Sequence, residues 1–132
     1  MNIAMIAHDS RKELLCQFCT AYVRIFNKHH LVATAVTGRV VHEATGLNIQ
    51  CLYPGARGGA EQIAAKIVCG EVDVLLFFRD PVNAKPSEPN EQFLLRQCDM
   101  YNIPVATNIA TAEVLLHGIE NGDLDWLEVL HS

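Results

Sequence analysis

Short apolar runs alternate with longer segments of helical period along most of the chain. Such runs are typical of strands that are covered on both faces of a parallel sheet. The most apolar of them, 72–78, is expected near the sheet centre. The predicted strands are 3–7, 31–35, 48–53, 72–78 and 104–107.

The segments between these runs carry apolar residues at helical spacing. The firmest pattern covers 10–27, where Ser10 and Glu13 stand at capping-box spacing. Gly46 is placed to end a brief helix through 40–44 in a left-handed conformation. Other helices are predicted from the bend at 55–59 to Gly70, over 93–101 and over 111–118, with a short packing segment at the C-terminus.

Strands and helices alternate five times, and the connections between strands are too long for hairpins. This order predicts a single α/β domain over residues 1–132, a doubly wound sheet of five parallel strands with helices on both faces. The longest irregular segment, 79–90, follows the fourth strand, and its three prolines exclude regular structure. Long ordered loops are often functional.

Composition narrows the class of protein. A chain of 132 residues can bury a core without metals or disulfides, and half of its residues are hydrophobic. The net charge of −5 gives no basic surface for nucleic acid or an anionic membrane. No apolar run approaches the ~18 residues that span a bilayer. Because the N-terminus also lacks the pattern of a signal peptide, a cytoplasmic protein is expected.

The five cysteines and the paired histidines raise the question of metal or redox chemistry. All five cysteines lie in apolar or helical segments, which predicts reduced core thiols. Cys16 and Cys19 have the spacing of a redox pair or half a zinc site, but they lie inside a helical pattern. His29 and His30 are adjacent on a helix end and therefore point in different directions. No metal site is predicted.

The stretch 51–63 combines a strand end, a glycine-rich bend and the start of a helix. Gly55, Gly58 and Gly59 allow positive φ or close approach to a ligand. The helix start adds unpaired N–H groups and the positive end of its dipole, which favours an anion, most often phosphate. The spacing matches neither common phosphate-binding glycine motif, so a turn that simply requires glycine is the alternative.

In a doubly wound sheet the ligand crevice lies outside the carboxyl ends of the strands. Lys12, near the first turn of the first predicted helix, is close enough to that rim to counter a phosphate's charge. Thr34 and Thr37 offer hydroxyl donors. The strand ends that are expected to meet at the rim are 8–9, 34–38, 54–59, 79–80 and 107–108.

Several motifs in one order resemble the methylglyoxal synthase family over nearly the whole chain. They are the opening 3–9 with Lys12, the turn at 37–38, the run His-Glu-Ala-Thr-Gly-Leu-Asn at 42–48, the glycine-rich bend, 80–81 with the proline loop, and 103–108 followed by 111–113.

The resemblance implies a hexameric cytosolic lyase, without metal or organic cofactor, that converts dihydroxyacetone phosphate to methylglyoxal and phosphate and is inhibited by phosphate. In that chemistry a carboxylate removes a proton next to the carbonyl, polar groups hold the enediolate, and phosphate leaves. His8, Asp9 and Asp80 match the family's polar active-site positions. The implied phosphate-binding residues are Lys12, Thr34, Thr37, Gly55, Gly58 and Gly59.

The sequence departs from the family pattern at its acid and base positions. The family bend reads Ser-Gly-Pro-x-Gly-Gly-Asp, with the aspartate as catalytic base, whereas this chain has Pro54 at the serine position and Ala60 at the aspartate position. The family's proline loop reads Pro-His-x-Pro-Asp, and here Ser87 and Asn90 replace the histidine and the aspartate.

Two further departures concern phosphate and the neighbouring subunit. Val36 replaces one threonine of a pair, and no arginine follows Arg96, where the family carries a C-terminal arginine that reaches another subunit. Glu61 is adjacent to Ala60, but one helical step rotates a side chain by about 100°.

Loss of a positioned base costs roughly 100- to 10,000-fold in rate. The sequence therefore predicts a family member with a phosphate site and impaired lyase activity. One alternative is a non-catalytic binder of phosphate or a small phosphorylated metabolite, with a regulatory role. Another is a structural subunit that mixes with an active paralogue.

Overall fold

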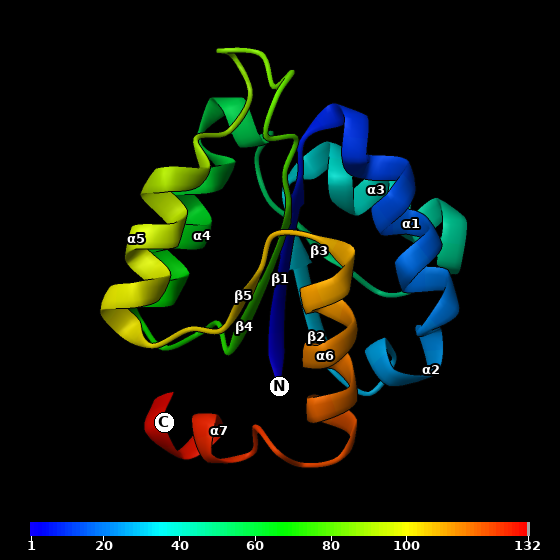
Figure 1. Cartoon of the computed structure of the whole chain (residues 1–132), viewed down its shortest axis with the longest axis vertical. Coiled ribbons are helices and arrows are strands. Elements are labelled where there is room, and N and C mark those ends of the chain that lie inside the picture. Colours follow the sequence, from blue (N-terminus) through cyan, green and yellow to red (C-terminus); the bar gives the residue numbers. More distant parts are fainter. Residues whose placement is uncertain (132) are drawn as a thin grey trace.

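The computed structural model describes residues 1–131 and contains one five-stranded parallel sheet (Figure 1). The strand order is β3-β2-β1-β4-β5, so β1 is the central strand and β4 lies directly beside it. The strands are β1 (Asn2–Ala7), β2 (His30–Ala33), β3 (Gln50–Cys51), β4 (Val74–Phe78) and β5 (Val105–Ala106).

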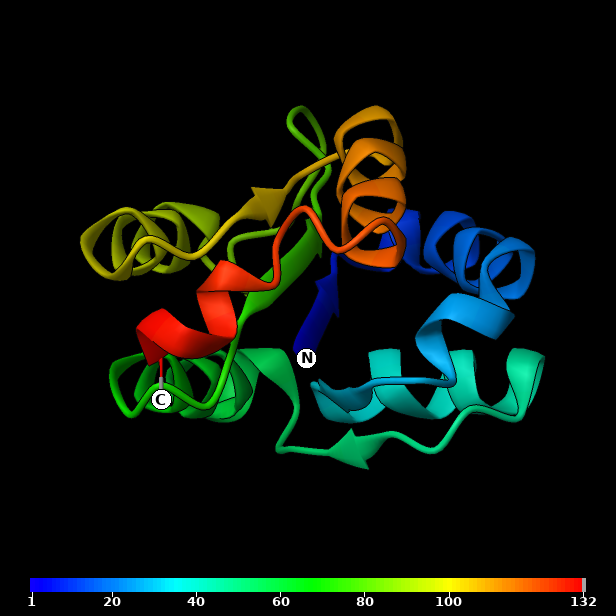
Figure 2. The same ribbon diagram turned by 90° about the horizontal axis from the view of Figure 1, so that it is seen from below.

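Helices cover both faces of the sheet, as the alternating pattern predicts (Figure 2). Their bounds are η1 (Asp9–Arg11), α1 (Lys12–Ala21), α2 (Val23–Phe26), α3 (Ala35–Thr45), η2 (Gly55–Arg57), α4 (Gly59–Val68), α5 (Glu91–Tyr101), α6 (Ile109–Glu120) and α7 (Trp126–His131). One buried cluster joins α1, α2, α3 and α6 to one face, and another joins α4 and α5 to the other. The doubly wound α/β prediction is confirmed.

The start of the first helix differs from the prediction. Ser10 lies in η1, the N-cap of α1 is Arg11, and no side chain caps it. The hydroxyl of Ser10 instead donates to the Asp80 carboxylate at 2.7 Å, so the predicted capping box with Glu13 is wrong. The helix also breaks at Tyr22, whose hydroxyl donates to the Glu113 carboxylate of α6.

The cysteines are all free thiols, but they do not all belong to the core. Cys19 and Cys98 are buried, and burial raises the pKa of the Cys98 thiol to about 12. Cys51 and Cys69 are exposed, because β3 is a two-residue edge strand and Cys69 caps the end of α4. The prediction of five core thiols is therefore wrong for these two. Among residues 1–131, no helix is long and apolar enough to cross a membrane.

Candidate functional site at the carboxyl ends of the strands

The crevice predicted for this fold lies between β1 and β4. The chain leaves β1 toward β2 and leaves β4 toward β5, in opposite directions along the sheet, which makes this pair the topological switch point. His8 follows β1, and Arg79 and Asp80 follow β4. In Figure 1 this rim is at the top, where the proline loop also lies.

His8 braces three segments of the rim. Its buried ring accepts a hydrogen bond at Nδ1 from the Asp80 amide at 2.8 Å. Nε2 must therefore carry the proton of the neutral ring, and it donates to the Pro89 carbonyl at 3.0 Å. Both ring nitrogens thus hydrogen-bond to backbone groups, and Nε2 also lies 3.8 Å from the Glu91 carboxylate.

Asp80 is an ionised acceptor that folds the start of the proline loop. Its carboxylate accepts from the amides of Asn83 and Val82 at 2.9 and 3.0 Å and from the Ser10 hydroxyl at 2.7 Å. These three donors lower the pKa of Asp80 to about 2. The contact of Ser10 with Asp80 could not be predicted from the sequence, because a serine at a helix start is ordinarily a cap.

Lys12 and Asp9 lie together at the start of α1. The Lys12 ammonium donates to the Asp9 carboxylate and to the Ala7 carbonyl, both at 2.8 Å. The lysine is mostly buried, whereas the Asp9 side chain is largely exposed. The hydrogen bond and charge of Lys12 lower the pKa of Asp9. The lysine is thus held at the end of β1, as a cation for the rim must be.

The start of α3 lacks the usual capping groups. Its N-cap is Thr34, which makes no side-chain cap hydrogen bond, and no acidic residue lies in the first turn. Thr37, one turn further, is 1% exposed, and its Oγ1 has no hydrogen-bond partner among the described residues. Val36, the departure beside it, is exposed. Buried hydroxyls are rarely left unpaired, so the Thr37 hydroxyl is a donor at this end of α3 whose partner has to be explained.

The glycine-rich bend is packed closely against its surroundings. A Cβ at Gly59 would collide with the Tyr53 carbonyl and lie 2.9 Å from Cγ2 of Thr34. A Cβ at Gly55 would lie 2.5 Å from Cγ of Pro89, and Gly58 has φ +100°, which favours glycine. The bend therefore lies beside Thr34 on one side and the proline loop on the other. Pro54 forms its N-terminal boundary and accepts from the Gly59 amide at 2.9 Å.

The rim helices α3 and α4 differ from α5 and α6 in their N-terminal capping. Asn90 and Asn108 cap α5 and α6 by accepting from backbone amides, at 3.0 and 3.1 Å. The N-cap of α4 is Gly58, which has no side chain to offer. The first turns of α3 and α4 therefore lack a side-chain cap. Their first amides, those of Ala35 and Gly59, donate to the carbonyls of Tyr53 and Pro54 at 3.2 and 2.9 Å, so it is the following amides of each turn that can meet an anion.

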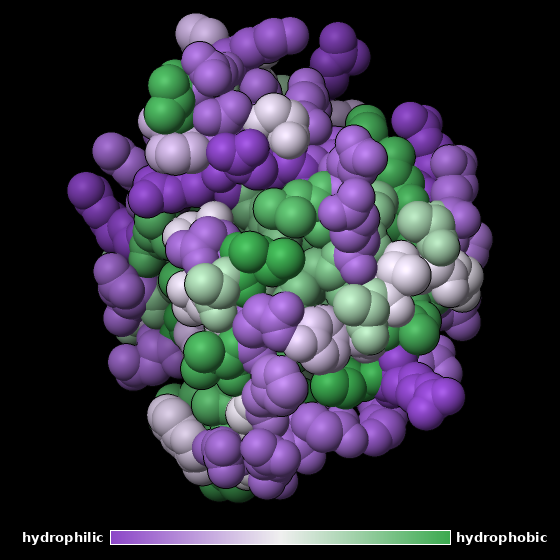
Figure 3. All heavy atoms as spheres, turned by 45° about the vertical axis from the view of Figure 1, so that its right-hand side comes forward, coloured by the Kyte–Doolittle hydropathy of each residue, from purple (hydrophilic) through white to green (hydrophobic). Residues whose placement is uncertain are grey.

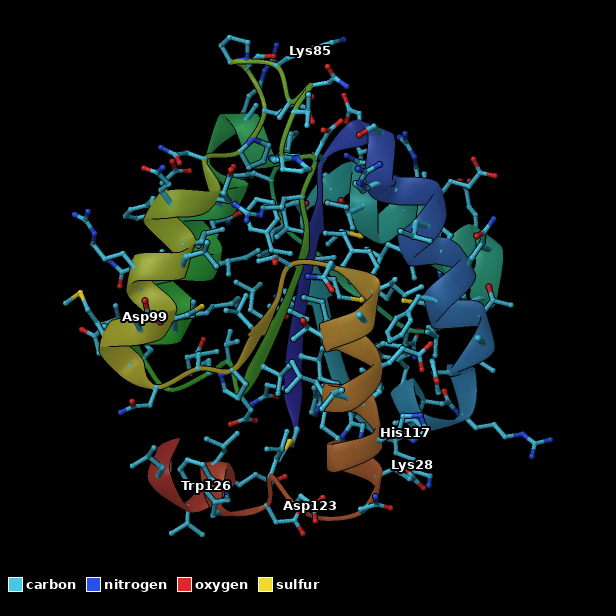
Figure 4. The ribbon with its side chains drawn as sticks, viewed as in Figure 1. Lys28, Lys85, Asp99, His117, Asp123 and Trp126 are labelled. Carbon is cyan, nitrogen blue, oxygen red and sulfur yellow. The ribbon has the colours of Figure 1, made fainter. Side chains whose placement is uncertain are left out.

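The proline loop is fastened to the rim by Glu88. One oxygen of its carboxylate accepts from the Asp9 amide at 2.9 Å, and the other accepts from the Lys85 amide at 3.0 Å. Lys85 lies at the outer tip of the loop, at the opposite end of the molecule from Trp126 (Figure 4). The sequence places Glu88 between two prolines but does not reveal which amides it reaches.

A pocket of about 740 Å3 opens between the bend and the proline loop. All three positions at which the chain lacks a family acid or base line it, namely Ala60, Ser87 and Asn90. Gly55 lines it as well, so the pocket adjoins the bend. Three further residues line the pocket that were not among the site residues predicted from the sequence: Arg57, Glu88 and Phe93. Such a volume is in the range of small-molecule sites.

Within the part of the chain whose side chains are described, no cluster of three or more His, Cys, Asp or Glu residues is suited to hold a metal ion. Nδ1 of His29 instead lies 2.9 Å from the amino group of Met1.

Known proteins with similar sequence or structure agree on one family. Residues 15–107 match the model of the family described as the MGS-like domain. The chain is 54% identical over 129 residues to methylglyoxal synthase of Thermoanaerobacter sp. (strain X514), covering 98% of each chain. It is 51% identical over 131 residues to methylglyoxal synthase of Caldicellulosiruptor saccharolyticus, covering 99% of this chain and 93% of that one.

A solved structure shows the same architecture. The crystal structure of methylglyoxal synthase from Elizabethkingia anophelis NUHP1 matches 87% of this chain and 76% of its own, with a TM-score of 0.85 and 32% identity. The fold and the relatives together define a doubly wound α/β protein of the MGS-like class. The chain belongs to the methylglyoxal synthase family.

Proposed function

We propose that the rim binds the phosphate of a small phosphorylated metabolite, of which dihydroxyacetone phosphate is the family's substrate, and that lyase turnover is impaired. The observation that carries the binding proposal is Thr37, a buried hydroxyl without a partner among the described residues, in the first turn of an uncapped helix. A phosphate oxygen there would satisfy the hydroxyl.

The surrounding groups supply what an anion needs. Lys12 contributes a positive charge at the end of β1. Thr34 lies beside Gly59, and this contact brings the start of α3 next to the start of α4. Backbone amides at two helix starts and one ammonium are a common phosphate-binding set.

The proposal of impaired turnover rests on the pocket beside the bend. Ala60 is 4% exposed and offers no base at the position where the family carries its catalytic aspartate. The nearest carboxylates lining the pocket are Glu61 and Glu88, and both oxygens of Glu88 already accept from backbone amides. Without a base we expect methylglyoxal formation to be slower by roughly 100- to 10,000-fold.

The test restores the missing groups. Purified protein is incubated with dihydroxyacetone phosphate, and methylglyoxal and released phosphate are measured. The variant Ala60→Asp/Ser87→His/Asn90→Asp is expected to exceed the parent, and its Asn90→Asp change retains an oxygen to cap α5. The matched control, Ala65→Asp with the same two loop changes, adds its carboxylate on the exposed side of α4 and should not gain activity.

Two results would contradict the proposal of impaired turnover. Turnover by the parent at ordinary enzyme rates would show that another base serves, and Glu61→Gln would then test the adjacent carboxylate. A triple variant no faster than its control would show that the roles assigned to positions 60, 87 and 90 are wrong.

A second candidate function is a non-catalytic, regulatory phosphate binder, favoured by an intact rim beside a pocket that lacks the family's acid and base side chains at positions 60, 87 and 90. Phosphate at 100 times its Kd should stabilise the protein by about 2.7 kcal/mol, which a thermal-shift experiment detects. Lys12→Met should weaken this effect, whereas Lys28→Met, on the far side of the molecule, should not (Figure 4). Absence of any shift with phosphate would leave only a structural role for the domain.

A further inference from the structure

The pocket between the bend and the proline loop is larger than a bare phosphate site requires. This open pocket has a volume of about 740 Å3, and Gly55 of the glycine-rich bend lines it, so it adjoins the proposed phosphate site. Two of its walls are small side chains, Ala60 and Ser87, where the family carries an aspartate and a histidine. The space that catalytic groups would fill is therefore open to a ligand.

The chemistry of the walls is that of a hydroxyl-rich ligand. Ser87 presents a hydroxyl group, and Glu61 presents a carboxylate. Asn90 uses its carbonyl oxygen to cap α5, which leaves its NH2 group as a donor. Hydroxyl, amide and carboxylate groups are suited to bind sugar hydroxyls, which both donate and accept.

Other ligand classes fit these walls less well. A second phosphate would meet the carboxylates of Glu61 and Glu88, whose like charge repels it, against the single cation of Arg57. A wholly apolar ligand would cover Glu61 and Arg57 without pairing them. Phe93, 41% exposed, offers one apolar surface, against which the carbon face of a sugar can pack.

We propose that this pocket binds the carbon chain or ring of a phosphorylated sugar longer than a triose, while the adjoining rim binds its phosphate. This inference rests on the proposed phosphate site, and it names the class of ligand that the site accepts. Glu61, Ser87, Asn90 and Phe93 are its specificity-determining residues.

Calorimetric titration of the intact chain tests the proposal. The probes are inorganic phosphate, glycerol 3-phosphate, ribose 5-phosphate and glucose 6-phosphate. One or two added hydrogen bonds should make at least one of the two longer probes bind about tenfold more tightly than glycerol 3-phosphate.

Variants locate the effect. Ser87→His fills the pocket, and Phe93→Ala removes its apolar wall, so each should abolish the tenfold preference of the longer probes over glycerol 3-phosphate. Tyr101→Ala is the matched control for Phe93→Ala, because Tyr101 is a similarly exposed aromatic, 37% exposed, on the same helix and outside the pocket. It should retain the preference.

The possible outcomes distinguish failure of the sugar subsite from failure of the phosphate site. Equal affinities for glycerol 3-phosphate and both longer probes would overturn the sugar subsite and leave the phosphate site standing. A preference that survives both Ser87→His and Phe93→Ala would place the sugar elsewhere and also overturn it. Failure of every probe, inorganic phosphate included, would overturn the phosphate site and this inference together.

Discussion

At the scale of single residues, the bend depends on Gly59 for packing and not for conformation. Gly59→Ala should lower the free energy of unfolding by about 1–3 kcal/mol, because the new Cβ meets the carbonyls of Tyr53 and Pro54. Urea unfolding measures the change. Gly46→Ala is the comparison: Gly46 has φ +75° and open space around it, so only backbone strain, about 1 kcal/mol, is expected. Equal losses in the two variants would contradict the tight bend.

A second residue-scale prediction concerns acid stability. Because the pKa of Asp80 is lowered to about 2, its contribution to stability is complete above the ordinary aspartate pKa and is lost as the pH falls toward 2. Asp80→Asn should therefore be less stable than the parent at pH 7, and the difference should shrink between about pH 4 and pH 2.

Thermal unfolding over this pH range makes the measurement. Asp99→Asn, an exposed aspartate of α5, is the control and should follow the parent (Figure 4). A difference between Asp80→Asn and the parent that persists at its full size at pH 2 would show that the carboxylate is not the group responsible.

Some contacts of the candidate site could be predicted from the sequence, and others could not. The expectation that His8 and Asp80 meet follows from the strand ends alone, and in the structure the Asp80 amide lies 2.8 Å from Nδ1 of His8. Partners that depend on side-chain direction, such as Ser10 with Asp80, could not be predicted. The binding and catalytic roles of these residues stay predictions.

At the scale of elements, the proline loop is an ordered strap and not a loose connection. Glu88 ties it to the Asp9 amide, and His8 ties it to the Pro89 carbonyl. Glu88→Ala should speed hydrogen exchange at the Asp9 amide by about three- to tenfold, the worth of one hydrogen bond. Glu120→Ala, which breaks an ion pair with Lys28, should leave that amide unchanged. Unaltered exchange in Glu88→Ala would show that other contacts hold the strap.

Elements were predicted better than their ends. The apolar period of the first helix runs on through the break at Tyr22, because Phe18 and Phe26 on either side are buried in the same core. The period of the hydrophobic residues indicates which face of a helix is buried, but it does not reveal a break in the helix. The edge strand β3 (Gln50–Cys51) is shorter than the predicted strand 48–53, since it pairs only with the end of β2.

At the scale of the whole molecule, the surface carries apolar side chains that a single chain leaves uncovered. Figure 3 shows hydrophobic side chains gathered over the middle of one face, below a hydrophilic top. Exposed apolar residues on α6 and α7 include Val114, Trp126, Val129 and Leu130. Together with the family resemblance, this surface leads us to propose a homo-oligomer, a hexamer by resemblance.

Light scattering on the purified protein tests the assembly. The expected mass is six times that of the 14.6-kDa chain. Trp126→Glu/Val129→Glu should reduce the assembly, whereas Val82→Glu, an equally exposed apolar position on the proline loop, should not. A monomeric parent would contradict the proposal, as would an assembly that is insensitive to the α7 changes.

The overall arrangement was the most predictable level, because alternating strands and helices with long connections admit few topologies. The strand order was not predicted from the pattern, since it depends on which edge each crossover returns to.

The commitment of both His8 nitrogens to backbone groups bears on how such domains diverge. An imidazole that joins β1, β4 and the proline loop contributes to the folded structure whether or not the protein catalyses a reaction. Position 60 has no comparable structural role, since the small apolar side chain of Ala60 packs in the core there. Substitution of the catalytic base can thus remove catalysis in this fold while the histidine remains. The presence of the histidine alone therefore does not indicate activity.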